Sequence, residues 1–377
     1  MTSISLPRNE AVARAARERS EQERETTGIG ATSCPTRARS YERHQALMSA
    51  ELANALAVSL QGALGDVKIQ GLKRLSAGAS RETWSFDAVA SDESHQLILQ
   101  RHRSAASQLR GGLDEPELLR CALAGGVRVP QIVASDISGE NSIGAPFMVS
   151  RRIQGESIPR KILRDDSFAG ARRGLVADFG RELAAIHRLE MDSGDQITAI
   201  DDPLAVQRML YEAFDDPHPV FDLAFRWLDQ CRPQTRQPCV VHGDFRMGNI
   251  LVDSGGVAAV LDWELAYIGN PAFDLGWLVA RAWRFGEVGE VGGVGTRSEL
   301  LDAYRANGGA AVTLEELRWW EMLACLRWGV VTMAMVADHR QGRSSSMEQA
   351  VIGRRVVETE YDVMLLLRPE VLGKALA

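Results

Sequence analysis

One segment of about forty residues, 240–279, constrains the fold of this chain more than any other, and it reads VVHGDFRMGNILVDSGGVAAVLDWELAYIGNPAFDLGWLV. Two short apolar runs, 250–252 and 257–261, flank an Asp-Ser-Gly-Gly stretch whose residues favour a tight turn, so we predict a β-hairpin. A hairpin brings its two ends together. Asp262, directly after the second strand, is therefore expected beside Asn249, directly before the first.

An aspartate upstream of the hairpin completes the pattern. Asp244 precedes Asn249 by five residues, in a stretch where Gly243 and Gly248 interrupt any regular structure and predict a loop. Phosphoryl transfer needs one aspartate to take the proton of the attacking hydroxyl, and an asparagine and a second aspartate to hold Mg²⁺ against nucleotide phosphates. Mg²⁺ prefers oxygen ligands, so Asn and Asp suit it whereas His and Cys do not. The segment therefore predicts kinase chemistry without specifying the substrate.

The motifs GDFRMGNILVD and LDWELAYIGNPAFDLGW resemble the aminoglycoside phosphotransferase-type, protein-kinase-like family, and most closely the branch related to the kinase-like domain of acyl-CoA dehydrogenase family member ten. The resemblance extends over roughly 72–366 and is most specific over 240–277. It implies an α+β, bilobal protein-kinase-like fold, with a small nucleotide lobe on an antiparallel sheet and a larger, mostly helical lobe. It also implies that Asp244 is the catalytic base and that Asn249 and Asp262 bind Mg²⁺.

Three further residues around this pattern are expected to have structural roles. The resemblance implies that Asp274 ties the metal-binding loop to the following helix, which is compatible with a helix cap. His242 is expected to brace the loop by hydrogen bonding. An amphipathic helix over 176–189 is predicted to pack beneath the loop, and His187 near its end is expected to have a packing or helix-end role.

The stretch LSAGASRETW, residues 75–84, resembles the phosphate-covering turn of the same family. Its small residues let backbone N–H groups approach a phosphate. By this resemblance Gly78, Ala79 and Ser80 bind the phosphates of ATP. A turn of this composition is more often an ordinary hairpin, and its position upstream of the other motifs favours the phosphate-binding interpretation.

The cation expected for the α- and β-phosphates is displaced by one residue. The buried strand predicted at 97–99 should be followed by Arg or Lys, but Gln100 stands there and Arg101 comes next. A slip of one residue turns a side chain to the other face of a sheet. Either a bulge brings Arg101 to the site, or Gln100 replaces the cation by hydrogen bonding, and we favour Arg101. Glu115, in the next predicted helix, is expected to pair with that cation.

The run GAPFMVSRRI, residues 144–153, predicts a buried strand that enters the link between the two lobes. In kinase-like folds the adenine of ATP binds at this link through hydrogen bonds to the backbone. The backbone around Ser150 to Arg152 is therefore our candidate for the adenine contact. The cofactors expected for the site as a whole are ATP and Mg²⁺.

The composition is that of an ordinary soluble globular protein, with 377 residues, 45% hydrophobic and 25% charged, and a net charge of −7. This charge gives no support for a nucleic-acid partner. The first residues lack the apolar core of a signal peptide, and no run of about eighteen apolar residues indicates a membrane span. The five cysteines are scattered without metal-ligand spacing, which is typical of a reducing compartment. We expect a cytoplasmic protein.

Three regions are expected along the chain. Residues 1–38 are polar and charge-rich and predict a flexible leader. Residues 39–150 are expected to form the N-terminal nucleotide-binding lobe, which begins with a helix over 41–64. Residues 151–377 are expected to form the C-terminal catalytic and acceptor-binding lobe.

The favoured function is an ATP- and Mg²⁺-dependent kinase that phosphorylates a hydroxyl of a small molecule. The branch resemblance favours a hydroxyacyl-CoA or a related metabolite as the acceptor. An aminoglycoside or other antibiotic kinase is the second hypothesis, and it requires an acceptor cleft lined by carboxylates. Glu287 and Glu290 are available for such a cleft, whereas Arg281, Arg284 and Arg297 nearby favour an anionic acceptor.

A nucleotide-binding pseudokinase with a regulatory role is the third hypothesis. Gln100 supports it, because the usual cation is missing at that position. The presence of Asp244, Asn249 and Asp262 opposes it, since a scaffold has no need of all three. A protein kinase is less favoured, because HGD and DWE stand where HRD and DFG are expected.

Overall fold

The computed structural model describes residues 35–77, 81–90, 93–102, 114–191, 197–343 and 346–368, and the chain divides into two compact units, Met1–Ala53 and Asn54–Ala377. Helix α2 (Pro35–Leu64) contains the helix that the sequence predicted over 41–64. Most of the expected leader, residues 1–34, lies outside the described part of the chain. All the remaining elements belong to the larger unit, which also carries the candidate site.

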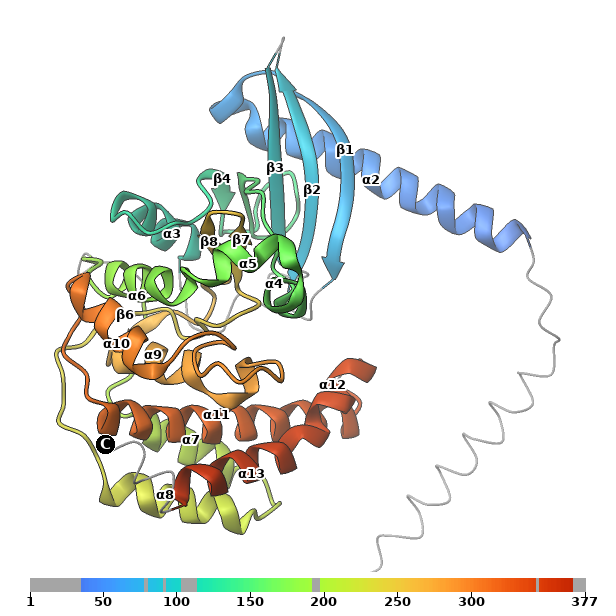
Figure 1. The fold of residues 1–377 in the computed structure, drawn as a ribbon. Helices are drawn as coiled ribbons and strands as arrows, with labels where there is room; N and C mark the ends of the chain where they lie inside the picture. Colours follow the sequence, from blue (N-terminus) through green and yellow to red (C-terminus); the bar gives the residue numbers. More distant parts are fainter. Residues whose placement is uncertain are drawn as a thin grey trace, which may run out of the picture. The chain divides into compact units, whose positions relative to one another are not determined.

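The larger unit begins with a five-stranded sheet of order β1-β2-β3-β5-β4, in which all neighbouring strands are antiparallel (Figure 1). Period-2 alternation places Leu97 and Leu99 of β3 on the fully buried face, while Ile98 and Gln100 line a cavity on the other face. Helix α3 (Glu115–Ala124) follows β3 and is capped by the side chain of Asp114. The strands are β1 (Lys68–Ala77), β2 (Arg81–Ala90), β3 (Glu93–His102), β4 (Ile132–Asp136) and β5 (Phe147–Arg151).

The rest of the larger unit is mostly helical (Figure 1), so the sheet-then-helices order predicted from the sequence is observed. Short strands form two two-stranded sheets, β6 with β9 and β7 with β8. The elements are α4 (Pro159–Arg164), η2 (Asp166–Phe168), α5 (Ala169–Arg172), α6 (Leu175–Ile186), α7 (Pro203–Glu212), α8 (Pro219–Gln230), β6 (Cys239–Val241), β7 (Ile250–Asp253), β8 (Gly256–Val260), β9 (Tyr267–Gly269), α9 (Ala272–Val279), η3 (Arg281–Trp283), α10 (Arg297–Ala306), α11 (Leu314–Arg340), α12 (Met347–Ile352), η4 (Gly353–Arg355) and α13 (Val356–Leu367).

Two hydrophobic clusters fix the segment that carries the motif. The first joins α3, α6 and the β7–β8 hairpin and contains the fully buried rings of Phe179 and Trp263. The second surrounds α11 and contains the indoles of Trp277 and Trp320. Because α9 contributes Leu275 and Leu278 to the first cluster and Trp277 to the second, this short helix is held from both sides.

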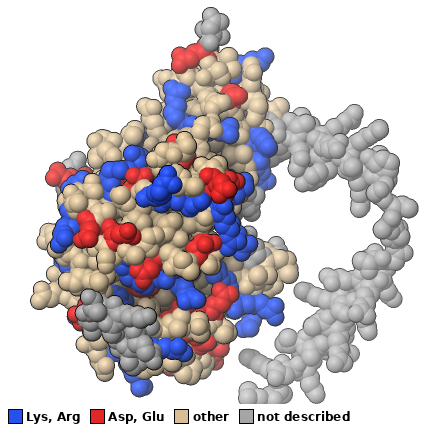
Figure 2. All heavy atoms as spheres, in the orientation of Figure 1, with Lys and Arg blue, Asp and Glu red and all other residues tan. Residues whose placement is uncertain are grey.

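Helix α11 is the one helix among the described residues that is long and apolar enough to cross a membrane by length and composition. However, 61% of its most apolar stretch is buried inside the fold, which is the behaviour of a core helix. On the face of the molecule drawn in Figure 2, acidic and basic side chains are interspersed, in keeping with the mixed charge of the sequence.

Helix α9 packs closely against α11 at Gly276. A Cβ at this position would lie 2.5 Å from the backbone carbonyl carbon of Trp320. Gly276→Ala should therefore lower the free energy of unfolding by about 1–3 kcal/mol through overpacking. Gly62→Ala in α2 is the matched control: nothing lies within 4 Å of its Cβ, and it should stabilise the protein by up to about 1 kcal/mol. Denaturant unfolding measures both changes, and a Gly276→Ala variant as stable as the wild type would contradict the close packing.

Candidate active site

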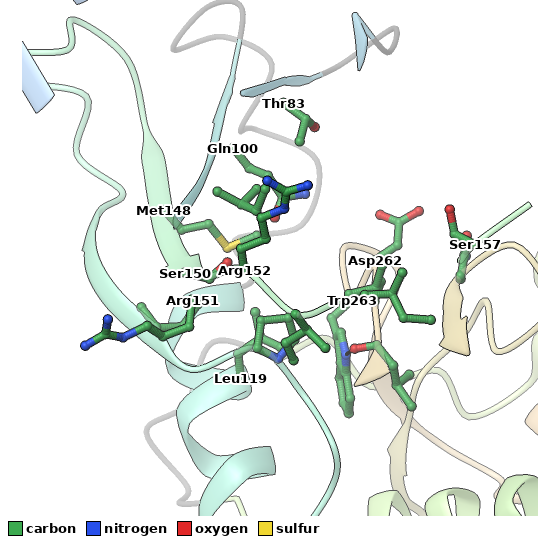
Figure 3. Close-up of a pocket in the computed structure, with 18 of the residues that line it drawn as sticks. Thr83, Gln100, Leu119, Met148, Ser150, Arg151, Arg152, Ser157, Asp262 and Trp263 are labelled. Atoms are coloured by element: carbon green, nitrogen blue, oxygen red, sulfur yellow. Dashed lines mark hydrogen bonds between the residues drawn. The ribbon is translucent and has the colours of Figure 1, made fainter. Parts of the chain in front are cut away.

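A cavity of about 690 Å³ opens between the five-stranded sheet and the hairpin segment. Thr83, Gln100 and Met148 line it from the sheet. Figure 3 shows the side chain of Asp262 on the opposite side of the cavity from Gln100 and Met148. Two segments far apart in the sequence therefore share one pocket, which is large enough for a small-molecule ligand.

The predicted hairpin is confirmed, and it brings the two expected metal ligands together. Strands β7 and β8 pair antiparallel, with Ile250 opposite Val260. At the open end of the hairpin the Leu261 N–H donates to the carbonyl oxygen of Asn249 at 2.8 Å. As a consequence Asn249 and Asp262 line the same cavity.

Three side chains donate hydrogen bonds to the carboxylate of Asp244. Its Oδ1 accepts from Trp277 Nε1 at 2.7 Å and from Arg246 Nε at 3.0 Å. Its Oδ2 accepts from Asn249 Nδ2 at 2.6 Å. These contacts fix the direction of the carboxylate, which is the geometric requirement for a group that takes a proton at one defined point.

The fully buried carboxylate of Asp274 ties the loop to α9, as the resemblance implied. Its Oδ2 accepts the His242 N–H at 2.8 Å and its Oδ1 accepts the Gly243 N–H at 2.9 Å. The ring of His187 adds a contact from Nε2 to Oδ2 at 3.1 Å, and its Nδ1 lies 2.7 Å from the Tyr304 hydroxyl. His187 therefore has the packing role expected for it, and it supports the loop through Asp274.

The ring of His242 braces the loop by hydrogen bonding, as predicted. Its Nδ1 accepts the Asp244 N–H at 3.2 Å, which places the ring proton on Nε2. That Nε2 lies 3.1 Å from the carbonyl oxygen of Leu261, next to Asp262. Burial lowers the pKa of His242, so the ring is neutral and joins the two parts of the site by one hydrogen bond at each nitrogen.

Asp262 adopts a conformation that few non-glycine residues adopt, with φ of 65°. Burial raises the pKa of its carboxyl, and the negative charges of Asp244 and Glu115 raise it further. A backbone strained at this point and carboxylates gathered around it are features of a functional site. A cation placed here would relieve the repulsion between these carboxylates.

The donor set at this point fits Mg²⁺. The Nδ2 of Asn249 is bonded to Asp244, which leaves the Oδ1 of Asn249 and the carboxylate of Asp262 as oxygen ligands. Within the described ranges, no three His, Cys, Asp or Glu side chains are placed so that together they could hold a metal ion. A metal here would take the rest of its ligands from water and phosphate, and Mg²⁺ is usually bound in that way.

The predicted ion pair between Arg101 and Glu115 is wrong. Arg101 bonds Glu82 instead, with Nε at 2.9 Å and Nη2 at 2.8 Å from Oε2. Strands β2 and β3 pair without a register shift, so no bulge turns Arg101 toward the cavity. Glu115 pairs with Arg81, whose Nη2 lies 2.6 Å from Oε2.

Arg81 is the positively charged residue of the cavity that sequence reasoning missed. It lines the cavity from the first position of β2 and makes a second ion pair with Glu264 at 3.2 Å. Gln100 lines the same cavity without a charge. The alternation of side chains along β2 could have indicated Arg81. It stands two residues before Thr83 and is therefore on the same face of the sheet, and Thr83 lies opposite Gln100 in the neighbouring strand.

The residues predicted to meet adenine line the cavity, but part of their backbone is already bonded. Ser150 and Arg152 line the cavity. The Arg151 N–H donates to the carbonyl of Gln131 at 2.9 Å, and the Arg152 N–H donates to the carbonyl of Gln96 at 2.9 Å. Neither N–H can donate to an adenine ring while these bonds stand.

The predicted phosphate-covering turn, Gly78-Ala79-Ser80, lies outside the described residues. The strands on either side of it pair antiparallel, with Ala77 of β1 opposite Glu82 of β2.

Comparison with known proteins gives a family and several distant relatives. The model of a phosphotransferase enzyme family matches residues 71–320, more than half of the chain. Acyl-CoA dehydrogenase family member 11 of Rattus norvegicus is 25% identical over 242 residues, and member 10 of Mus musculus is 26% identical over 244 residues. These matches cover 58% and 59% of this chain, but only 30% and 22% of the relatives. The similarity therefore covers less than a third of either relative.

Solved structures confirm the kinase-like fold. A protein described as a candidate aminoglycoside phosphotransferase of Ralstonia eutropha has a TM-score of 0.63 at 21% identity, over 83% of this chain and 97% of that chain. A thermostable mutant of aminoglycoside phosphotransferase APH(4)-Ia, bound to AMP-PNP and hygromycin B, has a TM-score of 0.54 at 16% identity, over 83% and 98%. At these identities the likeness concerns the fold alone.

Asp274 tests the anchoring of the loop. Asp274→Ala leaves two buried N–H groups without their acceptor, and each such group costs roughly 1–3 kcal/mol, so the free energy of unfolding should fall by at least about 2 kcal/mol. Asp302→Ala is the control, because Asp302 is 73% exposed and pairs with Arg305 one turn away, and it should change stability by less than about 0.5 kcal/mol. Denaturant unfolding at neutral pH compares the two. Equal stability of both variants would show that the loop does not depend on this carboxylate.

Proposed function

The chain belongs to the phosphotransferase enzyme family, and we propose that it is a kinase that transfers the γ-phosphoryl group of ATP to a hydroxyl of a small molecule, with Mg²⁺. The observation that carries this proposal is the meeting of three residues at one cavity. Asn249 and Asp262 line it, and Asn249 is bonded to the carboxylate of Asp244. The AMP-PNP bound to the APH(4)-Ia relative, an ATP analogue, supports ATP as the donor.

Asp244 is the proposed base. A carboxylate offers about four acceptor positions, and Trp277, Arg246 and Asn249 occupy three of them. The remaining position can accept the hydrogen of the acceptor hydroxyl. As that oxygen forms its bond to the γ-phosphorus, the proton passes to Asp244, and ADP leaves on the opposite side of the phosphorus.

Asn249 and Asp262 are the residues that would hold Mg²⁺, through oxygen atoms alone. When bound, the ion neutralises the negative charge of the phosphoryl group in transfer. Asn249 would then connect two functions, because its Nδ2 donates to Asp244 while its Oδ1 is left for the ion. A shift of this one side chain would disturb both the base and the metal.

The adenine is proposed to bind at the end of β5. The N–H of Ile153 has no protein acceptor in the part of the chain that the structure describes, and Ile153 lines the cavity. It is therefore better suited to donate to the adenine ring than the N–H groups of Arg151 and Arg152, which are bonded to carbonyl oxygens. Apolar contacts above and below the ring would come from Leu251 and Met148.

The acceptor is proposed to be anionic, because one arginine is bonded to the base and a second lies over the indole that donates to it. The guanidinium of Arg246 lies 4.6 Å from the ring centroid of Trp283 and donates to Asp244. The guanidinium of Arg327 lies 4.9 Å from the ring centroid of Trp277, whose indole also donates to Asp244. Among the described residues no carboxylate is in ion-pairing distance of Arg327. Such a cation is available to an anionic substrate.

The charged residues that the sequence offered for the acceptor cleft are largely paired with one another. Arg284 and Arg297 both pair with the buried Glu321, at 2.9 and 2.8 Å. Glu290 pairs with Arg297, and Glu287 pairs with an arginine of α4. The carboxylates that an aminoglycoside kinase would use are therefore engaged, and two of the arginines that argued against it are engaged as well.

A hydroxyacyl-CoA or a related hydroxylated acyl metabolite fits an anionic acceptor site, because it combines phosphate groups with a hydroxyl. The similarity to acyl-CoA dehydrogenase family members 10 and 11 supports this class. An aminoglycoside remains the second candidate, because hygromycin B is bound in the APH(4)-Ia relative. The hydrogen-bonded set of Asp244, Asn249 and Asp274 favours an active enzyme over a pseudokinase.

Substitution of the two aspartates separates the base from the metal. Asp244→Ala should abolish turnover and leave the affinity for MgATP within about threefold, because the base contacts the acceptor rather than the nucleotide. Asp262→Ala should instead lose Mg²⁺-dependent nucleotide binding. Coupled ATP-consumption assays across hydroxyacyl-CoAs, hydroxy acids and aminoglycosides, with calorimetric MgATP titrations, measure both effects. Full activity in either variant would contradict the assigned roles.

The charge of the acceptor is tested at Arg327. Arg327→Met should raise the KM for a hydroxyacyl-CoA by about tenfold or more, the loss expected for one hydrogen bond to a charged group, with the KM for ATP unchanged. Arg208→Met is the matched control, since Arg208 also lies over an aromatic ring, that of Phe225 at 4.5 Å, and pairs with Asp229. A variant at 327 that turns over aminoglycosides better than any acyl-CoA would favour the antibiotic kinase.

A further inference from the structure

We propose that Arg81, on β2, is the residue whose positive charge holds the α- and β-phosphates of ATP, a role that β3 was expected to supply. This inference rests on the proposed function, because it assigns a residue to the nucleotide half of the same cavity. In the sequence Arg81 directly follows Gly78-Ala79-Ser80, the turn predicted to cover the phosphates.

Strand register decides which side chains of β2 and β3 face the cavity. The two strands pair without interruption, with Thr83 opposite Gln100 and Arg81 opposite His102. Arg81, Thr83 and Gln100 all line the cavity. Successive side chains of a strand point to opposite faces, so Arg101 points away from the cavity.

Strand β3 therefore offers no free positive charge to a nucleotide. Gln100 is neutral, and Arg101 is paired with Glu82 on the other face at 2.8 Å. Burial acts to raise the pKa of Glu82, but the hydrogen bond and charge of Arg101 outweigh it and lower that pKa. The pair is thus a stable feature of the sheet. Releasing Arg101 would leave the Oε2 of this partly buried carboxylate without its partner, because Arg74 bonds only Oε1.

The side chain of Arg81 is held by two ion pairs and has one donor without a partner among the described residues. Its Nη2 pairs with Glu115 at 2.6 Å and with Glu264 at 3.2 Å, and the side chain is 13% exposed. Its Nε is buried and has no hydrogen-bond partner among the described residues. A buried donor without an acceptor is unfavourable. A phosphate oxygen would satisfy it, and the planar guanidinium suits phosphate geometry.

The surrounding acids keep Arg81 charged and oriented. Burial acts to lower the pKa of Arg81, but the charge and hydrogen bond of Glu115 outweigh it and raise that pKa. Glu115 lies on α3 and holds the guanidinium through Nη2, while Nε is left without a hydrogen-bond partner among the described residues. The helix was expected to carry this carboxylate, and only its partner differs.

The test is the binding of MgATP and of adenosine to the full chain, measured by isothermal titration calorimetry. Arg81→Met should weaken MgATP by about 30-fold, the size expected for hydrogen bonds from a charged group to phosphate. Adenosine carries no phosphate, so its affinity should change by less than about threefold. A loss confined to MgATP distinguishes a phosphate contact from general damage to the lobe.

Two arginine variants and a rescue complete the design. Arg74→Met is the matched control, because Arg74 also pairs with a glutamate of this sheet, Glu82 at 2.7 Å, and does not line the cavity. Arg101→Met tests the competing cation, and both variants should bind MgATP as the wild type does. In the double variant Arg81→Met with Gln100→Arg, a cation returns to β3 on the cavity face. MgATP affinity should then recover to within about fivefold of the wild type.

Three outcomes would overturn the inference: wild-type MgATP affinity in Arg81→Met, loss of affinity in Arg101→Met instead, or equal losses of ATP and adenosine. If Arg81→Met does not fold, Arg81→Gln removes the charge and keeps a donor for Glu115, and the same ratio of affinities decides. The proposed function fails in a different way, namely when the wild type binds MgATP but phosphorylates no acceptor of any class.

Discussion

The buried carboxylate of Asp274 is the interaction on which the rest of the site depends. It accepts the N–H groups of His242 and Gly243, which begin the loop that carries Asp244. A fully buried carboxylate is stable only while its donors stay in place, so loop and helix α9 hold each other in one arrangement. Trp277, one turn further along α9, donates to Asp244 and passes the same constraint to the base. The loop geometry is therefore set by the helix that packs behind it.

The position of a charge matters more to nucleotide binding than the strand that supplies it. A guanidinium at the end of β2 and one at the end of β3 can reach the same point, because neighbouring strands lie about 4.8 Å apart and the arginine side chain is long. What is fixed is the carboxylate of Glu115, which selects Arg81 from the two arginines that the strand ends offer. Arg101, which has Glu82 opposite it in the ladder, then acts as part of the sheet.

The sequence predicted the features that depend on local spacing. Strand lengths and turn residues define the hairpin, and the proximity of Asn249 to Asp262 follows from it without knowledge of the rest of the chain. The partner of Glu115 could not be obtained in this way, because it depends on which face of β2 and β3 meets helix α3, and no spacing rule connects these elements. The pairing of Arg284 with Glu321 is a similar case, since it is set by the packing of α11.

The proposed reaction brings two anions together, a nucleotide and an anionic acceptor, in a protein whose net charge is −7. Net charge is a weak guide here, because salt screens charges beyond about 8 Å at physiological ionic strength, whereas a partly buried cation acts on its neighbours at nearly full strength. The structure has such cations in both parts of the site: Arg81 lines the cavity, Arg246 is bonded to Asp244, and Arg327 lies over the ring of Trp277, whose indole donates to Asp244. Charge arranged in this way would lower the repulsion between the two proposed substrates before Mg²⁺ contributes, and it would favour an anionic acceptor over a cationic one. On this reasoning the choice of acceptor depends most on Arg327, which pairs with no carboxylate among the described residues, and a count of acidic and basic residues along the sequence does not reveal it.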